Sequence, residues 1–316
     1  MTSCVHPTER HEKLFLASDY VTGDQFEIRR CGSCGLAITW PPPPPEDMGR
    51  YYPATYYGEA GEKRFVGPVE GLQRALYGSR VRQLEQAIGG RTGRVLDVGC
   101  GRGFLLDAFR RRGWNVEGTE MSAASSAHAR EVLGILVQVG PLEALGIPGE
   151  SFDAVTIWHV LEHVPTPASL LDEIHRILRP GGVLLVSVPN FGSPEARASG
   201  PAWFHLDVPR HLVHFTPDTL VGALRGSGFE PLGTSWFTPE FDAFSFVQST
   251  LNRLGLRQNA LYDLLRGRAA KMSNGGGASA SASVLLAAPL GILSLPATLA
   301  ASLAGAGSTV TIVARR

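Results

Sequence analysis

The stretch VLDVGCGRGFLL (residues 95–106) decides the fold of this 316-residue chain. An apolar run ends at Val98, three glycines follow at positions 99, 101 and 103, and a helical pattern begins at Phe104. Glycines so placed permit a tight turn and a close approach of the backbone to a ligand. The helix that follows offers unpaired amides at its N-terminus. We therefore predict a strand–loop–helix unit that binds a nucleotide.

Short apolar runs alternate with helical patterns through the rest of the chain. They predict strands over residues 95–98, 114–119, 135–139, 152–158 and 183–188, the last of which follows a Pro-Gly-Gly turn, then a sixth strand over 228–238 and a final one over 308–316. Strands that alternate with helices form a parallel sheet covered on both faces. The predicted fold class is therefore α/β, doubly wound.

Two features bear on the class of nucleotide. Dinucleotide-binding loops have the pattern G-x-G-x-x-G, whose third glycine would fall where this chain has Phe104. Asp97 instead stands two residues before the first glycine. The second predicted strand ends in Glu120, whose carboxylate could accept hydrogen bonds from both ribose hydroxyls or cap the next helix.

The stretch DVGCGRG (97–103) resembles the first motif of the class I, Rossmann-like, S-adenosylmethionine-dependent methyltransferases. Residues 142–190 extend the resemblance with the patterns S-F-D-x-V, H-x-L-E-H and R-x-L-x-P-G-G. It implies a mostly parallel seven-stranded sheet with an antiparallel last strand. Many relatives place an acid after the third strand where this chain has Gly140-Pro141-Leu142, so the backbone of Leu142 would have to substitute. The implied S-adenosylmethionine-binding residues are Asp97, Gly99, Cys100, Gly101, Gly103, Glu120, Met121, Leu142, Trp158 and His159.

A loop rich in histidine and aromatic residues, WFHLDVPRHLVHFTPDTL (203–220), follows the fifth predicted strand. Similar P-R-H-L-x-H-F segments occur in methyltransferases of this kind. We predict that His211 acts as a base or orients the acceptor, with His159 and His214 as further catalytic candidates. The alternative is an ordered loop whose histidines cap helices or bond carbonyls.

Three of the four cysteines lie in the first 34 residues. Cys31 and Cys34 form a C-x-x-C turn, and Cys4 and His6 could complete a tetrahedral zinc site, with His11 as the other candidate for the fourth ligand. The segment resembles the zinc ribbons that precede some bacterial methyltransferase domains. A metal-free ribbon or a redox pair are the alternatives. The predicted boundaries are 1–45 for this module, 46–92 for a linker and helix, and 93–316 for the methyltransferase domain.

An apolar insertion occupies about residues 245–306 of that domain. From Met272 to Ala314 there is no charged residue, and Pro289 and Pro296 interrupt the apolar run. Length alone would permit a membrane span. Because both ends must return to one sheet, we predict a helical hairpin that is buried or lies at a membrane surface, with peripheral contact through residues 272–304.

The charge and composition of the chain limit the classes of function and partner that we expect. The chain has 29 Lys and Arg residues and 29 Asp and Glu residues. A net charge of zero gives no general attraction to nucleic acid, so we expect no nucleic-acid partner. The first residues lack the apolar core of a signal peptide, so we expect a cytoplasmic protein, with or without membrane association. The predicted function is methyl transfer to a small or carrier-linked acceptor, such as a glycan or lipid-linked molecule. The alternatives are a non-catalytic docking module that kept the cofactor site, or a nicotinamide-dependent enzyme, which Phe104 disfavours.

Overall fold

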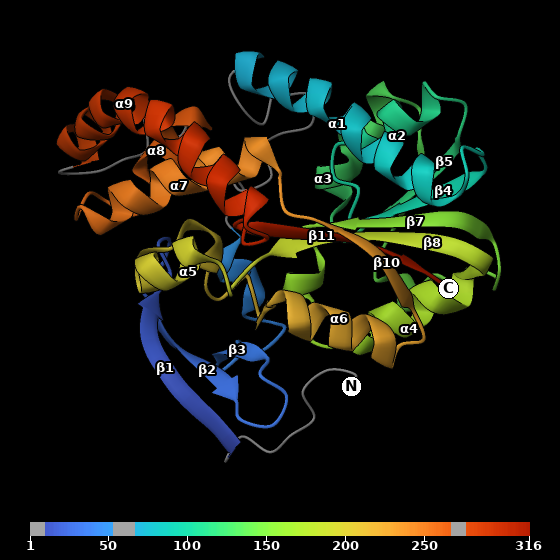
Figure 1. Ribbon diagram of the computed structural model, residues 1–316, viewed down its shortest axis with the longest axis horizontal. Coiled ribbons are helices and arrows are strands. Elements are labelled where there is room, and N and C mark those ends of the chain that lie inside the picture. Colours follow the sequence, from blue (N-terminus) through green and yellow to red (C-terminus); the bar gives the residue numbers. More distant parts are fainter. Residues whose placement is uncertain (1–9, 53–66, 267–275) are drawn as a thin grey trace.

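A computed structural model describes residues 10–52, 67–266 and 276–316 of the chain. Figure 1 shows a central twisted sheet with helices above and below it, a small sheet formed by the N-terminal residues, and a lobe of helices formed by residues near the C-terminus. The small sheet and the lobe lie near the same end of the central sheet.

The central sheet has seven strands in the order β10-β11-β8-β7-β4-β5-β6. The strands β6, β5, β4, β7 and β8 pair in parallel, whereas β11 runs antiparallel to both β8 and β10. This confirms the predicted mostly parallel sheet with an antiparallel last strand. The strands span Arg94–Val98 (β4), Asn115–Glu120 (β5), Leu136–Val139 (β6), Phe152–Trp158 (β7), Leu178–Pro189 (β8), Glu230–Ser235 (β10) and Thr309–Arg315 (β11).

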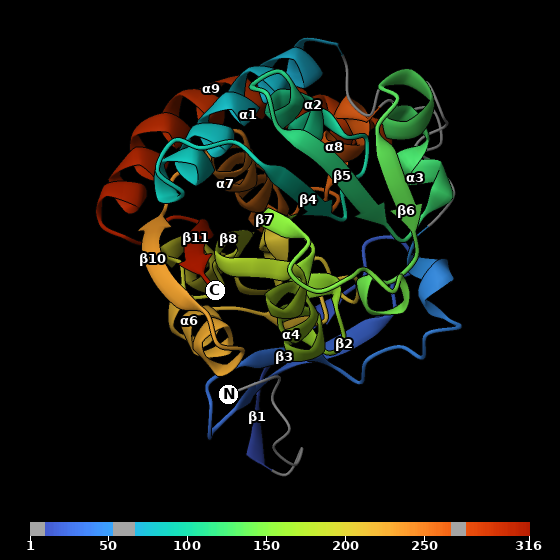
Figure 2. The ribbon, with the colours of Figure 1, turned by 90° about the vertical axis from the view of Figure 1, so that its right-hand side faces the viewer.

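Helices cover both faces of this sheet (Figure 2). Alternate residues of β8 face opposite sides of the sheet: Leu184 and Val186 pack on the side of α4 (Pro167–Ile177), whereas Val183 and Leu185 pack on the side of α1 (Gly67–Ala87). A parallel strand that is buried on both faces has a nearly continuous run of apolar residues in its sequence, as the second half of β8 does. The helices are Gly67–Ala87 (α1), Phe104–Arg110 (α2), Ala123–Ala127 (α3), Pro167–Ile177 (α4), Pro194–Ser199 (α5) and Pro217–Gly226 (α6).

The start of β8 differs from the prediction. We expected a Pro-Gly-Gly turn before a strand at residue 183, but β8 already begins at Leu178 and contains Pro180–Gly182. Its pairing with β7 shifts between Phe152 and Ala154, so the three residues form an irregular bulge at the strand entry. Proline and glycine are tolerated in strands at such irregular positions.

The N-terminal residues form an antiparallel sheet that the loop after β8 completes. β1 (His11–Ser18), β2 (Gln25–Cys31) and β3 (Ala37–Trp40) pair in order, and β9 (Val213–His214) adds to the edge of β3. Phe26 and Ile28 of β2 pack in one apolar cluster with Trp203 of that loop. The small sheet is therefore joined to the large domain by strand pairing and by a shared core.

The insertion is helical, but it is not the predicted hairpin. It folds as α7 (Pro239–Arg253), α8 (Ala260–Leu265) and α9 (Gly276–Leu303). The apolar run lies in the single helix α9, with Pro289 and Pro296 in its interior. Each proline removes one backbone hydrogen bond. In a helix of 28 residues that packs on α7 and α8, these isolated losses do not end the helix.

Candidate active site

The glycine loop between β4 and α2 has the geometry that its sequence predicts. Gly99, Gly101 and Gly103 all have positive φ, at 73°, 50° and 78°. A Cβ at Gly99 would lie 2.4 Å from Val160 Cγ2, and one at Gly103 would lie 2.7 Å from Ala129 Cβ. A Cβ at Gly101 would meet nothing within 4 Å. Two glycines therefore allow close packing of the loop, whereas Gly101 exposes bare backbone to open space.

Glu120 lies at the end of β5, beside this open backbone. Its Oε2 accepts a hydrogen bond from the Gly101 N–H at 3.0 Å, and its Oε1 accepts one from the Ser122 N–H at 3.2 Å. Each carboxylate oxygen can accept a second bond. Glu120 thus holds the loop in place and keeps the capacity to bind two hydroxyl groups.

Beneath the loop, Asp97 is a buried support. It accepts a hydrogen bond of 2.6 Å from the Thr156 hydroxyl, and burial raises its pKa to about 7. Burial also raises the pKa of the Cys100 thiol, which makes a thiolate nucleophile unfavourable there. Arg80 of α1 was not among the predicted site residues. Its guanidinium lies 3.8 Å from the centroid of a Trp158 ring.

The other predicted cofactor contacts differ in exposure. Met121 is 68% exposed, so its side chain is available to a ligand. The side chain of Leu142 is buried in the main hydrophobic core, which leaves only its backbone for contact. Both follow from the chain path: Met121 comes directly after β5, and Leu142 begins the short helical turn after β6.

His159 follows β7 in a conformation that side chains rarely adopt, with φ of 53°. Its Nδ1 lies 3.3 Å from Glu162 Oε1. Its ring stacks on His205 at 6.0 Å and contacts Phe241 at 4.5 Å between centroids. Strained backbone at the end of a central strand is typical of functional sites.

Glu162 is the centre of a buried histidine cluster. His211 Nδ1 donates to the His205 carbonyl at 2.8 Å, and His163 Nδ1 donates to the Arg210 carbonyl at 2.9 Å. The bond of His211 Nδ1 leaves its Nε2 to face the carboxylate, and His211 Nε2 lies 3.9 Å from Glu162 Oε1. One ligand atom each of Glu162, His163 and His211 lies within 4.8 Å of the others. The group thus has the donor types of a metal site as well as those of an acid–base pair.

Burial sets the charge of this cluster. Desolvation lowers the pKa of His159, His205 and His214 to about 3 and that of His163 to about 4. It lowers the pKa of His211 too, but Glu162 and Asp207 oppose this shift, and it raises the pKa of Glu162. The histidines are therefore neutral near pH 7, although the carboxylates of Glu162 and Asp207 oppose the lowering of the pKa at both His163 and His211.

Several buried polar atoms point to a ligand. Within the described residues, Trp158 Nε1, His159 Nε2, Glu162 Oε2 and His205 Nε2 have no hydrogen-bond partner. A buried polar atom without a partner costs about 1–3 kcal/mol. The four atoms lie together after the end of β7 and beside His205, so they could bind a polar ligand there.

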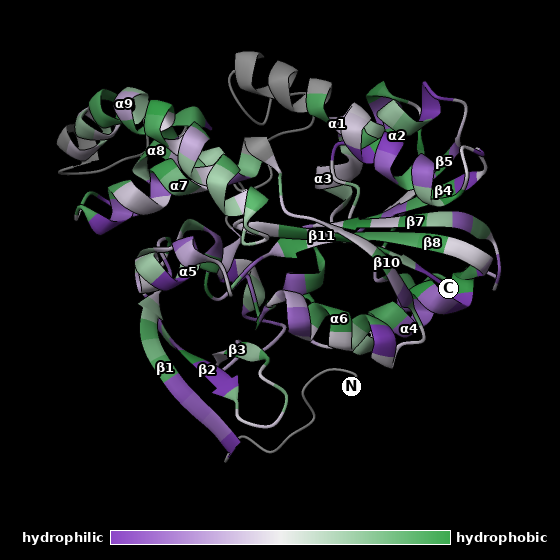
Figure 3. Ribbon diagram, viewed as in Figure 1, coloured by the Kyte–Doolittle hydropathy of each residue, from purple (hydrophilic) through white to green (hydrophobic). Residues whose placement is uncertain are grey.

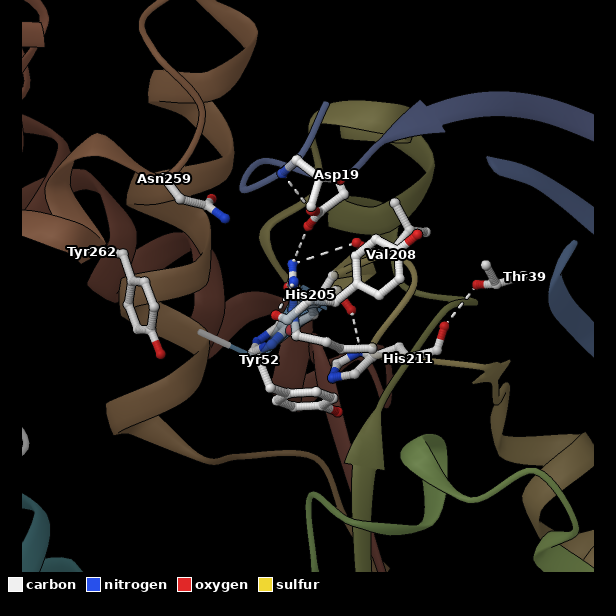
Figure 4. A network of polar contacts seen from close by, with 12 residues as sticks. Asp19, Thr39, Tyr52, His205, Val208, His211, Asn259 and Tyr262 are labelled. Atoms are coloured by element: carbon white, nitrogen blue, oxygen red, sulfur yellow. Dashed lines mark hydrogen bonds and ion pairs between the residues drawn. The ribbon is translucent and has the colours of Figure 1, made fainter. Parts of the chain in front are cut away.

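Arg210 ties this cluster to the N-terminal sheet through Asp19, which Figure 4 shows in one network of polar contacts with His205 and His211. Its fully buried guanidinium lies 2.7 Å from Asp19 and 2.8 Å from Asp207, and it donates to the Tyr51 carbonyl at 2.8 Å. Asp19 lies in the turn after β1, so the sequence offered no signal of this partner. The ion pair holds the loop of residues 203–214 against the small sheet.

His214 lies at the other side of the same loop. Its Nε2 is 3.0 Å from the Thr39 hydroxyl, which in turn donates to the His211 carbonyl at 2.6 Å. Leu212 N–H donates to the Glu162 carbonyl, and Thr39 N–H donates to the Leu212 carbonyl. The structure therefore brings His211 and His159 to Glu162 and turns His214 toward β3, where its contact with Thr39 supports the loop.

The cysteine turn is described in part. Cys31 ends β2, Ser33 N–H lies 3.4 Å from Cys31 Sγ, and Gly35 N–H donates to the Cys31 carbonyl. His11 stands directly opposite Cys31 in the pairing of β1 with β2. Cys4 and His6 lie outside the described residues.

A doubly wound sheet, a glycine loop after its first strand and an acid at the end of the second define a Rossmann-like nucleotide-binding protein. The model of the methyltransferase domain family matches residues 70–233, and the chain belongs to that family.

Named relatives and a solved structure agree with this. A ubiquinone biosynthesis O-methyltransferase of Pseudomonas aeruginosa is 39% identical over 118 residues, 35% of this chain and 50% of that protein. A protein of the same name from Ruegeria pomeroyi is 32% identical over 172 residues, 51% of this chain and 68% of its own length. The chain thus spans about half the length of the first relative. A structure of a proposed sarcosine dimethylglycine methyltransferase from Galdieria sulphuraria shares the fold, with a TM-score of 0.51, 15% identity and coverage of 85% and 98%.

Proposed function

We propose that this protein transfers a methyl group from S-adenosylmethionine to a hydroxyl group of a small or carrier-linked acceptor. The observation that carries the proposal is the pairing of bare backbone at Gly101 with the Glu120 carboxylate. Bare backbone accommodates the cofactor closely, and Glu120 can accept hydrogen bonds from its ribose. When bound, S-adenosylmethionine supplies a methyl group on a positively charged sulfur.

The histidine cluster and the names of the relatives, which are O-methyltransferases, support a hydroxyl acceptor. A hydroxyl must lose its proton as its oxygen attacks the methyl carbon. His211 Nε2 can take this proton because its Nδ1–H is already bound to the His205 carbonyl. Glu162, 3.9 Å away, stabilises the resulting imidazolium. The partnerless atoms of His159 and His205 would orient the acceptor.

The direct test is incubation of the protein with isotope-labelled methyl donor and a panel of phenols, glycans and lipid-linked alcohols, followed by mass spectrometry. The proposal expects label on an acceptor oxygen. Cofactor binding without transfer to any acceptor in the panel would favour the non-catalytic docking module.

Replacement of His211 by alanine should lower the turnover number by roughly 10²–10⁴-fold, the usual contribution of a positioned base. Affinity for S-adenosylmethionine should change less than about 2-fold, because His211 lies in the acceptor part of the site. The pKa of His211 is lowered from 6.5, so the wild-type rate should fall with decreasing pH only below that value.

The matched control is His214→Asn, which removes a buried histidine of the same loop that faces Thr39. It should alter stability more than the pH profile. Equal turnover in His211→Ala and wild-type protein, or an unchanged acid limb, would rule out His211 as the base.

We further propose that zinc binds Cys31 and Cys34 together with Cys4 and either His6 or His11. The turn at Cys31, with a backbone amide directed at the sulfur, and His11 opposite it on β1 support this arrangement. Elemental analysis should find about one zinc per chain, with loss in Cys31→Ser and retention in Cys100→Ala. Metal-free native protein would contradict the proposal.

A further inference from the structure

The helix α9 has its polar and apolar faces exchanged relative to an ordinary surface helix. Ser283, Ser294 and Thr298 face inward and are buried. The outward side chains are large and apolar, with Leu285 76%, Ile292 73% and Leu303 81% exposed. A helix of a water-soluble protein normally buries its apolar stripe and exposes its polar one.

The exposed apolar surface is wide and continuous. At ~100° per residue, the outward positions cover roughly half of the helix circumference. The stretch Ser279–Leu303 has a mean hydropathy of 2.0, is long and apolar enough to cross a membrane, and is only 11% buried in its most apolar window. In Figure 3 most of the α9 ribbon has the colour of hydrophobic residues. The exposed residues are Val284, Leu285, Leu286, Ile292, Leu293, Leu295, Leu299 and Leu303.

The inward face of α9 is fixed to the protein. The helix packs along α7 and against α8, and Ser302 Oγ donates to the Trp236 carbonyl at 2.9 Å. Six residues after Leu303 the chain enters β11, a strand inside the central sheet. Because α9 is held to the protein along its length, only its outer half can contact lipid. This geometry suits insertion in the plane of a bilayer surface.

The charges of the same segment select the kind of surface. From the start of α7, residues 239–304 contain five cations, Arg253, Arg257, Arg266, Arg268 and Lys271, and three acids, Glu240, Asp242 and Asp263, for a net charge of 5 − 3 = +2. Asp263 is buried and paired with Arg257. The whole chain is neutral, so residues 239–304 are more basic than the rest of the sequence. Anionic lipid headgroups attract such clusters.

We propose that the outer face of α9 inserts in the plane of an anionic lipid bilayer and anchors the protein there. The binding requires neither cofactor nor acceptor, so it is independent of the proposed methyl transfer. It would bring the strand ends of the catalytic domain close to acceptors that reside in a membrane.

The test is flotation of the full-length protein with vesicles of phosphatidylglycerol and phosphatidylcholine, compared with phosphatidylcholine alone. The intact chain should float with the anionic vesicles and lose most of this binding in high salt. The triple variant Leu285→Ser, Ile292→Ser, Leu299→Ser should bind at least ~10-fold more weakly. Arg253→Glu should weaken binding to anionic vesicles and leave binding to the neutral ones unchanged.

The matched control is Val132→Ser with Leu136→Ser, two apolar residues 63% and 62% exposed outside the lobe, and it should float as the wild type does. Absence of flotation by the intact chain, or full flotation by the triple variant, would overturn the proposal. Retention on vesicles after alkaline carbonate washing would indicate a membrane-spanning helix instead. Self-association that is lost in the triple variant, without flotation, would identify a second copy of the chain as the partner of α9.

Discussion

Replacement of Glu120 by alanine should weaken S-adenosylmethionine binding by about 10²-fold or more, since each hydrogen bond to a charged group contributes about 1.5–3 kcal/mol. The variant loses the ribose acceptor and also the bonds from the Gly101 and Ser122 amides that hold the loop. Glu120→Gln keeps one acceptor oxygen and should lose less. Calorimetric titration of each variant with S-adenosylmethionine measures the change.

Glu117→Gln is the control for this experiment. Glu117 lies on the same strand and pairs with Arg94 at 2.6 Å, away from the glycine loop. Its replacement should leave the affinity unchanged. Equal affinity of Glu120→Ala and wild-type protein would show that Glu120 only caps the following turn.

Replacement of Arg210 by methionine should lower the free energy of unfolding by about 3–5 kcal/mol, because it leaves Asp19 and Asp207 buried without their cation. The ion pair also joins the N-terminal sheet to the active-site loop, so turnover should fall with stability. Urea denaturation followed by circular dichroism measures the stability. Asp19→Asn removes one partner only and should show a smaller loss in the same direction.

The comparison for Arg210 is Arg30→Gln. Arg30 pairs with Glu12 at 3.0 Å, but these side chains are 51% and 67% exposed. Such surface pairs contribute about 0–1 kcal/mol. A similar effect of the two arginine replacements would mean that the buried pair does not hold the loop in place.

The parts of the fold that could be predicted are those whose residue pattern is visible within a short stretch of sequence. Several strands of the central sheet, such as β4, β7 and β11, are short apolar runs beside a turn or a helix, and Gly99 to Gly103 mark the loop by residue type alone. The cofactor side of the site follows from these elements, because the ends of neighbouring parallel strands meet at one edge.

The acceptor side of the site depends on contacts between distant residues. β9 has only two residues, too few to show an alternating pattern, and it pairs with β3, over 170 residues earlier in the chain. Asp19 and Arg210 likewise meet across 191 positions. No local pattern in the sequence identifies such partners. Their interactions become strong only because the folded chain buries them.

The form of the apolar insertion was mispredicted for a different reason. Pro289 and Pro296 suggested a break, since proline removes a backbone donor. In the folded chain one helix passes through both positions, and Ala287 and Leu290 of this helix pack against Val247 and Leu251 of α7.

The most direct test of the central claim is calorimetric titration of the wild-type protein with S-adenosylmethionine and S-adenosylhomocysteine, with NADH as the control ligand. The account predicts micromolar binding of both sulfur compounds at one site per chain and no binding of NADH. Binding of NADH, or of none of the three, would contradict it.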